Sequence, residues 1–186
     1  MKSLIIAAAS TVVLGFAAPA MAQVAMPDWS HPTYYGSLGD SYLQTNHNGG
    51  IDEITGRVGA RFGPTWGLEG EIGGGLSEGK SYTGLGGNRA TTQPISGAGY
   101  VVGYLPVAPN WELLARAGYG ESNFRDSVNG RSFSGDTHSA NFGVGAQYWL
   151  NGKDAIRVDY TRRDYLGGSQ SPIGADAYGL SYVRRF

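Results

Sequence analysis

From position 34 onward, apolar and polar residues alternate along the chain with a period of two, the pattern of a half-buried β-strand. The clearest segment covers 53–62, where Val58 and Phe62 belong to an apolar set and Arg57 and Arg61 to a polar set. Similar segments cover 66–77, 111–119, 140–148 and 156–163, and weaker ones cover 34–42, 98–104 and 178–186. The pattern therefore predicts eight strands.

The connections between these segments alternate between short and long. The short ones are 63–65, 106–110 and 151–154, and the long ones are 44–50, 78–92, 121–137 and 164–175. Strands joined in this way are typical of barrels that cross a membrane, which have short turns at one end and longer loops at the other. We expect an all-β, eight-stranded antiparallel up-and-down transmembrane β-barrel with both termini at the short-turn end.

The charges of the polar set decide which face points inward. They are five acidic residues and five arginines: Glu53, Arg57, Arg61, Glu69, Glu71, Glu112, Arg116, Arg157, Asp159 and Arg163. A soluble barrel of the lipocalin type, the alternative, would turn these charges to water, where Lys is as common as Arg. Because every cation here is Arg, whose planar group suits buried bidentate pairs, we expect a polar, ion-paired interior and a lipid-facing exterior.

The expected pairs cross between strands. Arg57 or Arg116 should meet Glu69, Glu71, Glu112 or Asp159, and Arg157 should lie at the depth of Glu112. With eight strands, these side chains are expected to fill the lumen.

Aromatic residues give a second line of evidence. Seven lie on the apolar set beside a short turn or a terminus, as in an interfacial girdle: Tyr34, Phe62, Trp66, Tyr104, Trp111, Tyr148 and Phe186. The assignment of Tyr104 assumes that the apolar set of 98–104 faces lipid. The same alternation places Val144 toward lipid and Gly145 in the lumen. We therefore expect Gly145→Ser to be tolerated far better than Val144→Arg.

Residues 1–22 have the layout of a cleavable signal peptide, leaving 23–186 as the barrel domain. Lys2 precedes a nearly unbroken apolar run from Leu4 to Ala18, which is too short for a comfortable transmembrane helix, and Ala20-Met21-Ala22 supplies small residues before a cut. The chain contains no cysteine, and a barrel whose backbone is paired around the ring needs no disulfide.

Three stretches carry a family resemblance: Tyr34-Tyr35-Gly36-Ser37-Leu38-Gly39, Phe142-Gly143-Val144-Gly145-Ala146-Gln147-Tyr148, and Tyr178 to Phe186. They resemble the outer-membrane β-barrel family, which includes opacity-like proteins, the membrane domain of outer membrane protein A, and outer membrane protein X. The resemblance implies contact with outer-membrane lipids and lipopolysaccharide, and recognition by the barrel-assembly machinery through Tyr182 and Phe186. Arg184 departs from that signal, which is usually apolar at this position.

Motifs for chemistry are weak. Gly74 to Ser81 fits G-x-x-x-x-G-K-S, but no helical pattern follows it, as a phosphate-binding loop requires. A related barrel family, the lipid A deacylases, uses a His-x-Ser pair where this chain has Asp159 and Thr161, so a general base is missing. His138 and Ser139 are adjacent in sequence, so their side chains point to opposite faces of a strand. His31 and His47 are far apart in the sequence and do not suggest a metal site. We expect no catalytic residue, cofactor or metal.

The leading hypothesis is therefore a non-enzymatic barrel that supports the outer membrane and displays extracellular loops. The loop 121–137 carries Phe124, Arg125, Arg131 and Phe133, which suit lipopolysaccharide or a host or surface ligand. A narrow porin-like pore or hydrophobic conduit is the first alternative, and a lipid A-modifying enzyme is the second. A net charge of −1 and the lack of a basic field argue against nucleic acid.

The signal-peptide interpretation makes a direct prediction. Protein isolated from membranes should begin at Gln23, which intact mass measurement would show. A mature form that retains Met1 or Lys2 would contradict it.

Overall fold

The computed structural model describes residues 28–45, 50–76, 79–83, 87–128, 131–166 and 174–186, so the predicted signal peptide and its cleavage site lie outside the described residues. No helix in these ranges is long and apolar enough to span a membrane. The described strands are β1 (Thr33–Thr45), β2 (Ile51–Phe62), β3 (Trp66–Gly75), β4 (Gly79–Thr83), β5 (Gly87–Ala108), β6 (Trp111–Val128), β7 (Arg131–Trp149), β8 (Asp154–Leu166) and β9 (Gly174–Arg185).

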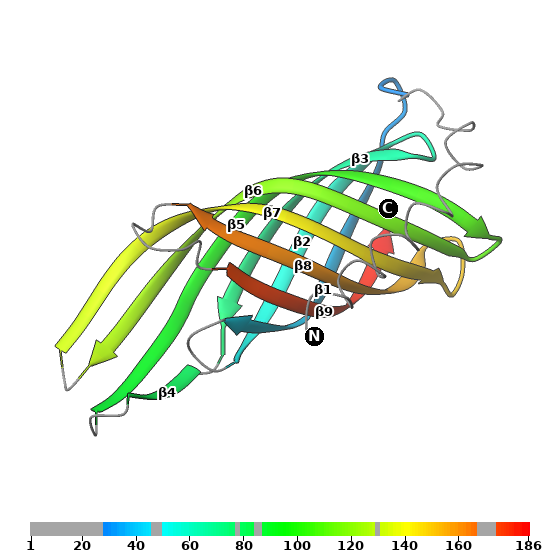
Figure 1. Cartoon of the computed structure of the whole chain (residues 1–186). Coiled ribbons are helices and arrows are strands. Elements are labelled where there is room, and N and C mark those ends of the chain that lie inside the picture. Colours follow the sequence, from blue (N-terminus) through cyan, green and yellow to red (C-terminus); the bar gives the residue numbers. More distant parts are fainter. Residues whose placement is uncertain (1–27, 46–49, 77–78, 84–86, 129–130, 167–173) are drawn as a thin grey trace, which may run out of the picture.

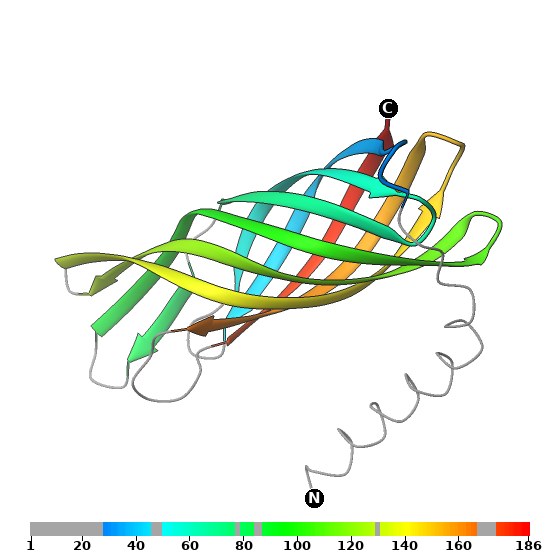
Figure 2. The ribbon, with the colours of Figure 1, turned by 90° about the horizontal axis from the view of Figure 1, so that it is seen from above.

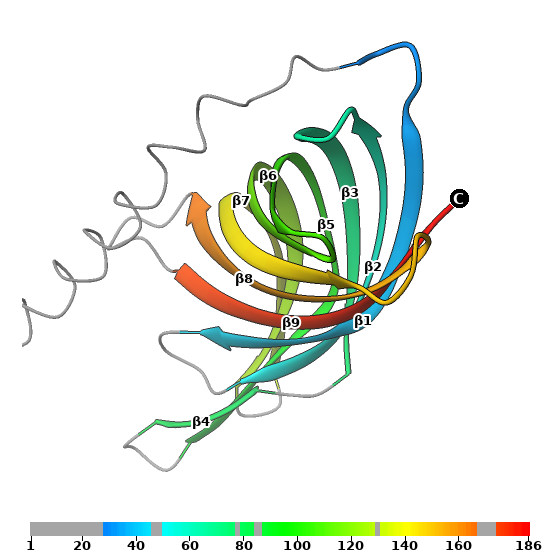
Figure 3. The same cartoon turned by 90° about the vertical axis from the view of Figure 1, so that its right-hand side faces the viewer.

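Eight of these strands close into an antiparallel barrel (Figures 1 and 3). Within the ring, strands that follow one another along the chain pair, β3 pairs with β5, and β9 pairs with β1. Among the described residues, the short β4 pairs only with β5 and forms a side hairpin outside the ring. The predicted fold is therefore confirmed, and its backbone groups are paired around the ring, as a membrane requires.

The strands differ in length. β5, β6 and β7 contain 22, 18 and 19 residues, and they extend well beyond the other strands at the long-loop end (Figures 1 and 2). The expected loops at 78–92 and 121–137 are therefore wrong, because β4 and β5 occupy most of the first and the β6–β7 ladder continues to Val128 and Arg131 in the second. Backbone pairing in a long hairpin outweighs a Gly- and Ser-rich composition. The structure does not describe the side chains of four residues expected in the second loop: Phe124, Arg125, Arg131 and Phe133.

The two faces of the sheet divide as the alternation indicates. Val58 and Val144 are 71% and 58% exposed on the outer face, whereas Glu53 and Arg157 are 0% and 1% exposed in the lumen. The outer face is thus apolar and the lumen is charged, the reverse of a soluble barrel.

On β5 the predicted faces are inverted. Tyr100, Val102 and Tyr104 are buried in the lumen, while Val101 is exposed on the outside. Tyr104 is therefore not a member of the girdle. The other predicted girdle residues lie near the short-turn end: Tyr34, Trp66, Trp111 and Phe186 are exposed, and Phe62 and Tyr148 are half-buried.

Glycine is required where the backbone turns or strands approach closely. Gly63 has a φ of 81° in the β2–β3 turn. A Cβ at Gly118 would lie 2.1 Å from the carbonyl oxygen of Gly99, and one at Gly145 would lie 2.6 Å from that of Val158. Serine at Gly145 would therefore also require the backbone to shift, and the comparison with arginine at Val144 stays a prediction.

We predict that Val58→Arg destabilises the barrel by about 2–4 kcal/mol, because it places a charge against mid-membrane lipid. The matched change Tyr34→Arg at the interface should cost roughly 0–1 kcal/mol. Urea unfolding in lipid vesicles measures both. Equal costs would show that Val58 does not lie at hydrocarbon depth.

Candidate functional site

The centre of the lumen holds four charged side chains from four strands. Arg57 on β2 donates to Glu71 at 2.7 Å and makes two hydrogen bonds to Asp159, of 3.0 and 3.1 Å. Arg116 on β6 donates to Glu71 at 3.0 Å and to Asp159 at 2.9 Å. Each carboxylate thus bridges two guanidinium groups, which compensates the desolvation of all four charges.

Glu69 extends this cluster toward the short-turn end. It accepts a 2.6 Å hydrogen bond from Arg157 and a 3.1 Å one from Arg116. The Tyr35 hydroxyl donates to the same carboxylate at 2.9 Å and shares a 2.8 Å hydrogen bond with Tyr104. Glu69 is therefore held by two cations and a buried phenol.

Between Glu69 and the short turns, the lumen is filled by Arg61 and Glu112, whose guanidinium and carboxylate form two contacts of 2.9 Å. Glu112 also accepts from Gln147 at 3.0 Å and from the Trp149 indole at 2.7 Å. Arg157 donates to the other end of the Gln147 amide at 2.9 Å. Arg157 and Glu112 thus lie close in depth but are bridged by an amide rather than paired directly.

At the long-loop end, Arg163 lies 3.2 Å from Glu53 and 3.3 Å from Glu71. Ser96 donates to Glu53 at 2.5 Å. Beyond this layer the lumen holds a buried apolar cluster of Leu43, Ile51, Tyr165, Ala175 and Ala177. The charged column therefore ends in a hydrophobic plug at this end.

All ten charged residues expected in the interior are thus brought together in the lumen, with five positive and five negative charges. Three tyrosines that complete the layer were not expected in the lumen. Arg61 and Arg116 lie 4.0 and 4.6 Å from the ring centroids of Tyr104 and Tyr100, and Arg157 lies 5.5 Å from that of Tyr35. The sequence of β5 contained a signal for the correct orientation. Its other face, with Val101 and glycines, suits lipid, and tyrosine hydroxyls inside a charged lumen find hydrogen-bond partners.

The lumen has no arrangement for nucleophilic catalysis among the described residues. Thr161 accepts hydrogen bonds of 3.1 and 2.6 Å from Arg116, and Asp159 is occupied by two arginines, so Asp159 does not serve as a general base for the Thr161 hydroxyl. His138 lies on the exposed surface, stacked on Tyr119 and 3.8 Å from Glu121. No group of three or more potential metal ligands occurs in the described part of the chain.

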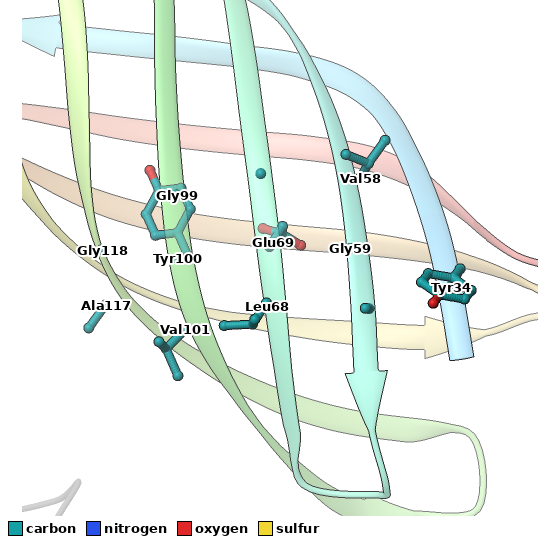
Figure 4. A pocket seen from close by; sticks show the side chains of 12 residues that line it. Tyr34, Val58, Gly59, Leu68, Glu69, Gly99, Tyr100, Val101, Ala117 and Gly118 are labelled. Carbon is teal, nitrogen blue, oxygen red and sulfur yellow. The ribbon is translucent and has the colours of Figure 1, made fainter. Parts of the chain in front are cut away.

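A shallow groove of about 630 Å³ crosses the outside of β2, β3, β5 and β6 (Figure 4). Its outward-facing lining is apolar, with Val58, Leu68, Val101 and Ala117 around a floor at Gly70 and Gly99. Glu69 and Tyr100 contribute backbone, because their side chains are buried in the lumen. This groove therefore offers lipid a smooth surface and no reactive group.

The comparisons with known proteins agree with this geometry. A family model described as the outer membrane protein beta-barrel domain matches residues 8–186. A search of curated proteins finds no match.

Among solved structures, OprG from Pseudomonas aeruginosa is similar with a TM-score of 0.61 and 9% identity, covering 86% of this chain and 98% of its own. Neisserial surface protein A gives 0.57 and 9%, covering 83% and 97%. The attachment invasion locus protein Ail of Yersinia pestis, in complex with the heparin analogue sucrose octasulfate, gives 0.53 and 13%, covering 83% and 97%. At these identities the likeness shows the fold alone.

The lumen geometry predicts strong coupling between Arg61 and Glu112. Arg61→Met and Glu112→Gln should each destabilise by about 3–5 kcal/mol, because each leaves a buried charge without its main partner. The double variant should lose less than the sum of the two, as measured by urea unfolding in lipid vesicles. Additive losses would show that the pair is not coupled.

A control pair is available at the surface. Arg184 and Asp154 also form an ion pair, at 3.1 Å, but the Arg184 side chain is 53% exposed. Solvent screening should make the coupling between Arg184→Met and Asp154→Asn small, so that the losses of the two single variants add.

Proposed function

The chain belongs to the outer membrane protein beta-barrel family, and on this premise we propose that it is a non-enzymatic barrel that stabilises the Gram-negative outer membrane and displays its long hairpins at the cell surface. The short turns then face the periplasm, and β5, β6 and β7 project outward. In this orientation the mature chain enters and leaves the barrel on the periplasmic side.

The observation that carries the proposal is the filled lumen. Charged side chains occupy its middle, with Tyr35, Ala155 and Val183 packed together near the short turns and Leu43 and Ile51 packed near the opposite end. Each of the five arginines in this charged set lies against a carboxylate, so the ten charges balance one another. A barrel of this kind serves as a rigid support rather than a passage.

Surface display is supported by the protruding hairpin. The β6–β7 ladder continues in register from Trp111 opposite Tyr148 to Val128 opposite Arg131. A paired hairpin of this length is a stiff platform for recognition. Ail is described as an attachment protein and was solved with a sulfated sugar, so an adhesive role toward lipopolysaccharide or a host surface ligand is the specific form that we propose here.

Assembly is the remaining part of the proposal. Tyr182 and Phe186 both point outward, with 46% and 79% exposure, where the barrel-assembly machinery could read them on the last strand. Arg184 lies on the same outward face and is held by Asp154 across the β8–β9 ladder. The charge that departs from the usual signal is therefore neutralised by a neighbour at the interface.

Replacing 125–134 by a short turn tests the display function. The shortened protein should still fold, shown by the usual heat-dependent gel shift, because the ring pairs up to Ile95 opposite Asn123 and Phe124 opposite Gly135 are retained. Bacteria producing it should lose adhesion to cells or to immobilised sulfated glycan relative to the full-length chain. Unchanged adhesion would contradict the display proposal.

Planar-bilayer recording distinguishes a closed supporting barrel from a narrow pore. The full-length barrel should give no stepwise ion conductance, because the lumen is closed. Reproducible channels that disappear when Arg116→Met is introduced would favour the narrow pore instead.

A further inference from the structure

The apolar outer surface of the barrel is not equally tall on all sides. On β3 and β5, the outward positions from Trp66 to Leu76 and from Ile95 to Leu105 carry no charged side chain. Each of these stretches covers ten residue steps. We call this side the tall wall.

On β8 and β9, the apolar stretch is shorter and ends in charge on both sides. Three outward residues on β8, Ile156 to Tyr160, lie between Asp154 and Arg162, and three on β9, Tyr178 to Tyr182, lie between Asp176 and Arg184. The register places Asp154 opposite Arg184 and Arg162 opposite Asp176. These opposed residues form ion pairs of 3.1 and 3.0 Å, so two charged rows cross the outside of the barrel.

β1 continues the short side. Asp40 is exposed on its outward face, in register with Leu180 on β9 and Ile54 on β2. We call β8, β9 and β1 the short sector. Its edges are sharp, because Arg162 pairs across the ladder with Phe142 of β7, which is 57% exposed and apolar.

Strand geometry converts these stretches to heights. At about 3.3 Å per residue and a tilt of about 40°, the ten steps of the tall wall rise about 25 Å, close to the usual apolar band. The eight steps between the charged rows rise about 20 Å, and the apolar residues between them span only about 10 Å. Tilting the whole barrel cannot remove the difference, because charge bounds the short sector at both ends.

Tyrosines mark the same two levels independently. The Tyr160 hydroxyl donates to Asp176 at 2.7 Å, toward the long-loop end, and the Tyr182 hydroxyl donates to Asp154, toward the short-turn end. Both rings thus place their polar ends at a charged row, as tyrosines do at the level of lipid head groups.

We propose that the barrel thins the outer membrane along the short sector, where the head groups of the outer-leaflet lipids and their hydration water descend to Arg162, Asp176 and Asp40. Keeping these charges in hydrocarbon is expensive, whereas thinning a bilayer costs little per ångström. The inference rests on the membrane location alone and does not depend on hairpin adhesion.

Spin labels on single cysteines test the proposal, since the chain has no native cysteine. Leu180 lies six residues before the girdle residue Phe186, and Ile72 lies six residues beyond Trp66, so Leu180→Cys and Ile72→Cys compare equivalent positions on the short sector and the tall wall and leave every charge in place. In dimyristoylphosphatidylcholine vesicles, we expect the label at 180 to collide with an aqueous nickel chelate several-fold more often than the label at 72. Equally low collision with the chelate and equally high collision with oxygen would show a flat bilayer and overturn the proposal.

A second variant separates thinning from burial by another copy of the chain. A label at Tyr178→Cys should lose most of its nickel collisions and gain oxygen collisions when Asp40, Arg162 and Asp176 are all changed to Leu. If the label instead meets neither reagent before the charges are removed, protein covers the short sector and thinning is refuted.

Discussion

The structure of this barrel depends on the mutual compensation of ten buried charges in the lumen, which cannot reach bulk water. An unpaired charge in such a place would be prohibitive, and a closed set of pairs with hydrogen bonds makes it tolerable. The contacts are not local: Arg157 of β8 reaches Glu69 of β3, and Arg116 of β6 reaches the same carboxylate. Because these links run across the lumen, they tie opposite walls together, which hydrogen bonding between neighbouring strands cannot do.

The backbone and the side chains therefore perform separate tasks. The ladder around the ring satisfies the main chain and leaves an apolar outer face, while the charged column fixes the distances between walls. The guanidinium groups are also stacked on Tyr100 and Tyr104, so aromatic faces shield part of the column. Glycines such as Gly118 let β5 and β6 approach closely where side chains already fill the interior.

Alternation in the sequence was sufficient to predict the fold and the inward direction of the charges, but not the extension of β5, β6 and β7 into the stretches expected to be long loops. It succeeded where one face carries charge, as at Arg57 and Glu71, because only one orientation keeps such residues out of lipid. It failed on β5, where neither face is charged between Ser96 and Leu105, and Tyr104 was placed outside. Pairing partners such as Arg61 with Glu112 could not be specified from sequence, since they depend on how far each strand is shifted relative to the others.

The pairing of β1 with β9 has a consequence for how the chain folds. These two strands are the most distant in sequence, yet they share eleven register pairs, from Tyr35 opposite Arg185 to Thr45 opposite Ala175. Until β9 docks, the curved sheet has two exposed edges able to join strands of other molecules. Closure therefore depends on the most non-local pairing of the fold, and a chain that lacks β9 would keep two edges open to aggregation rather than form a smaller barrel.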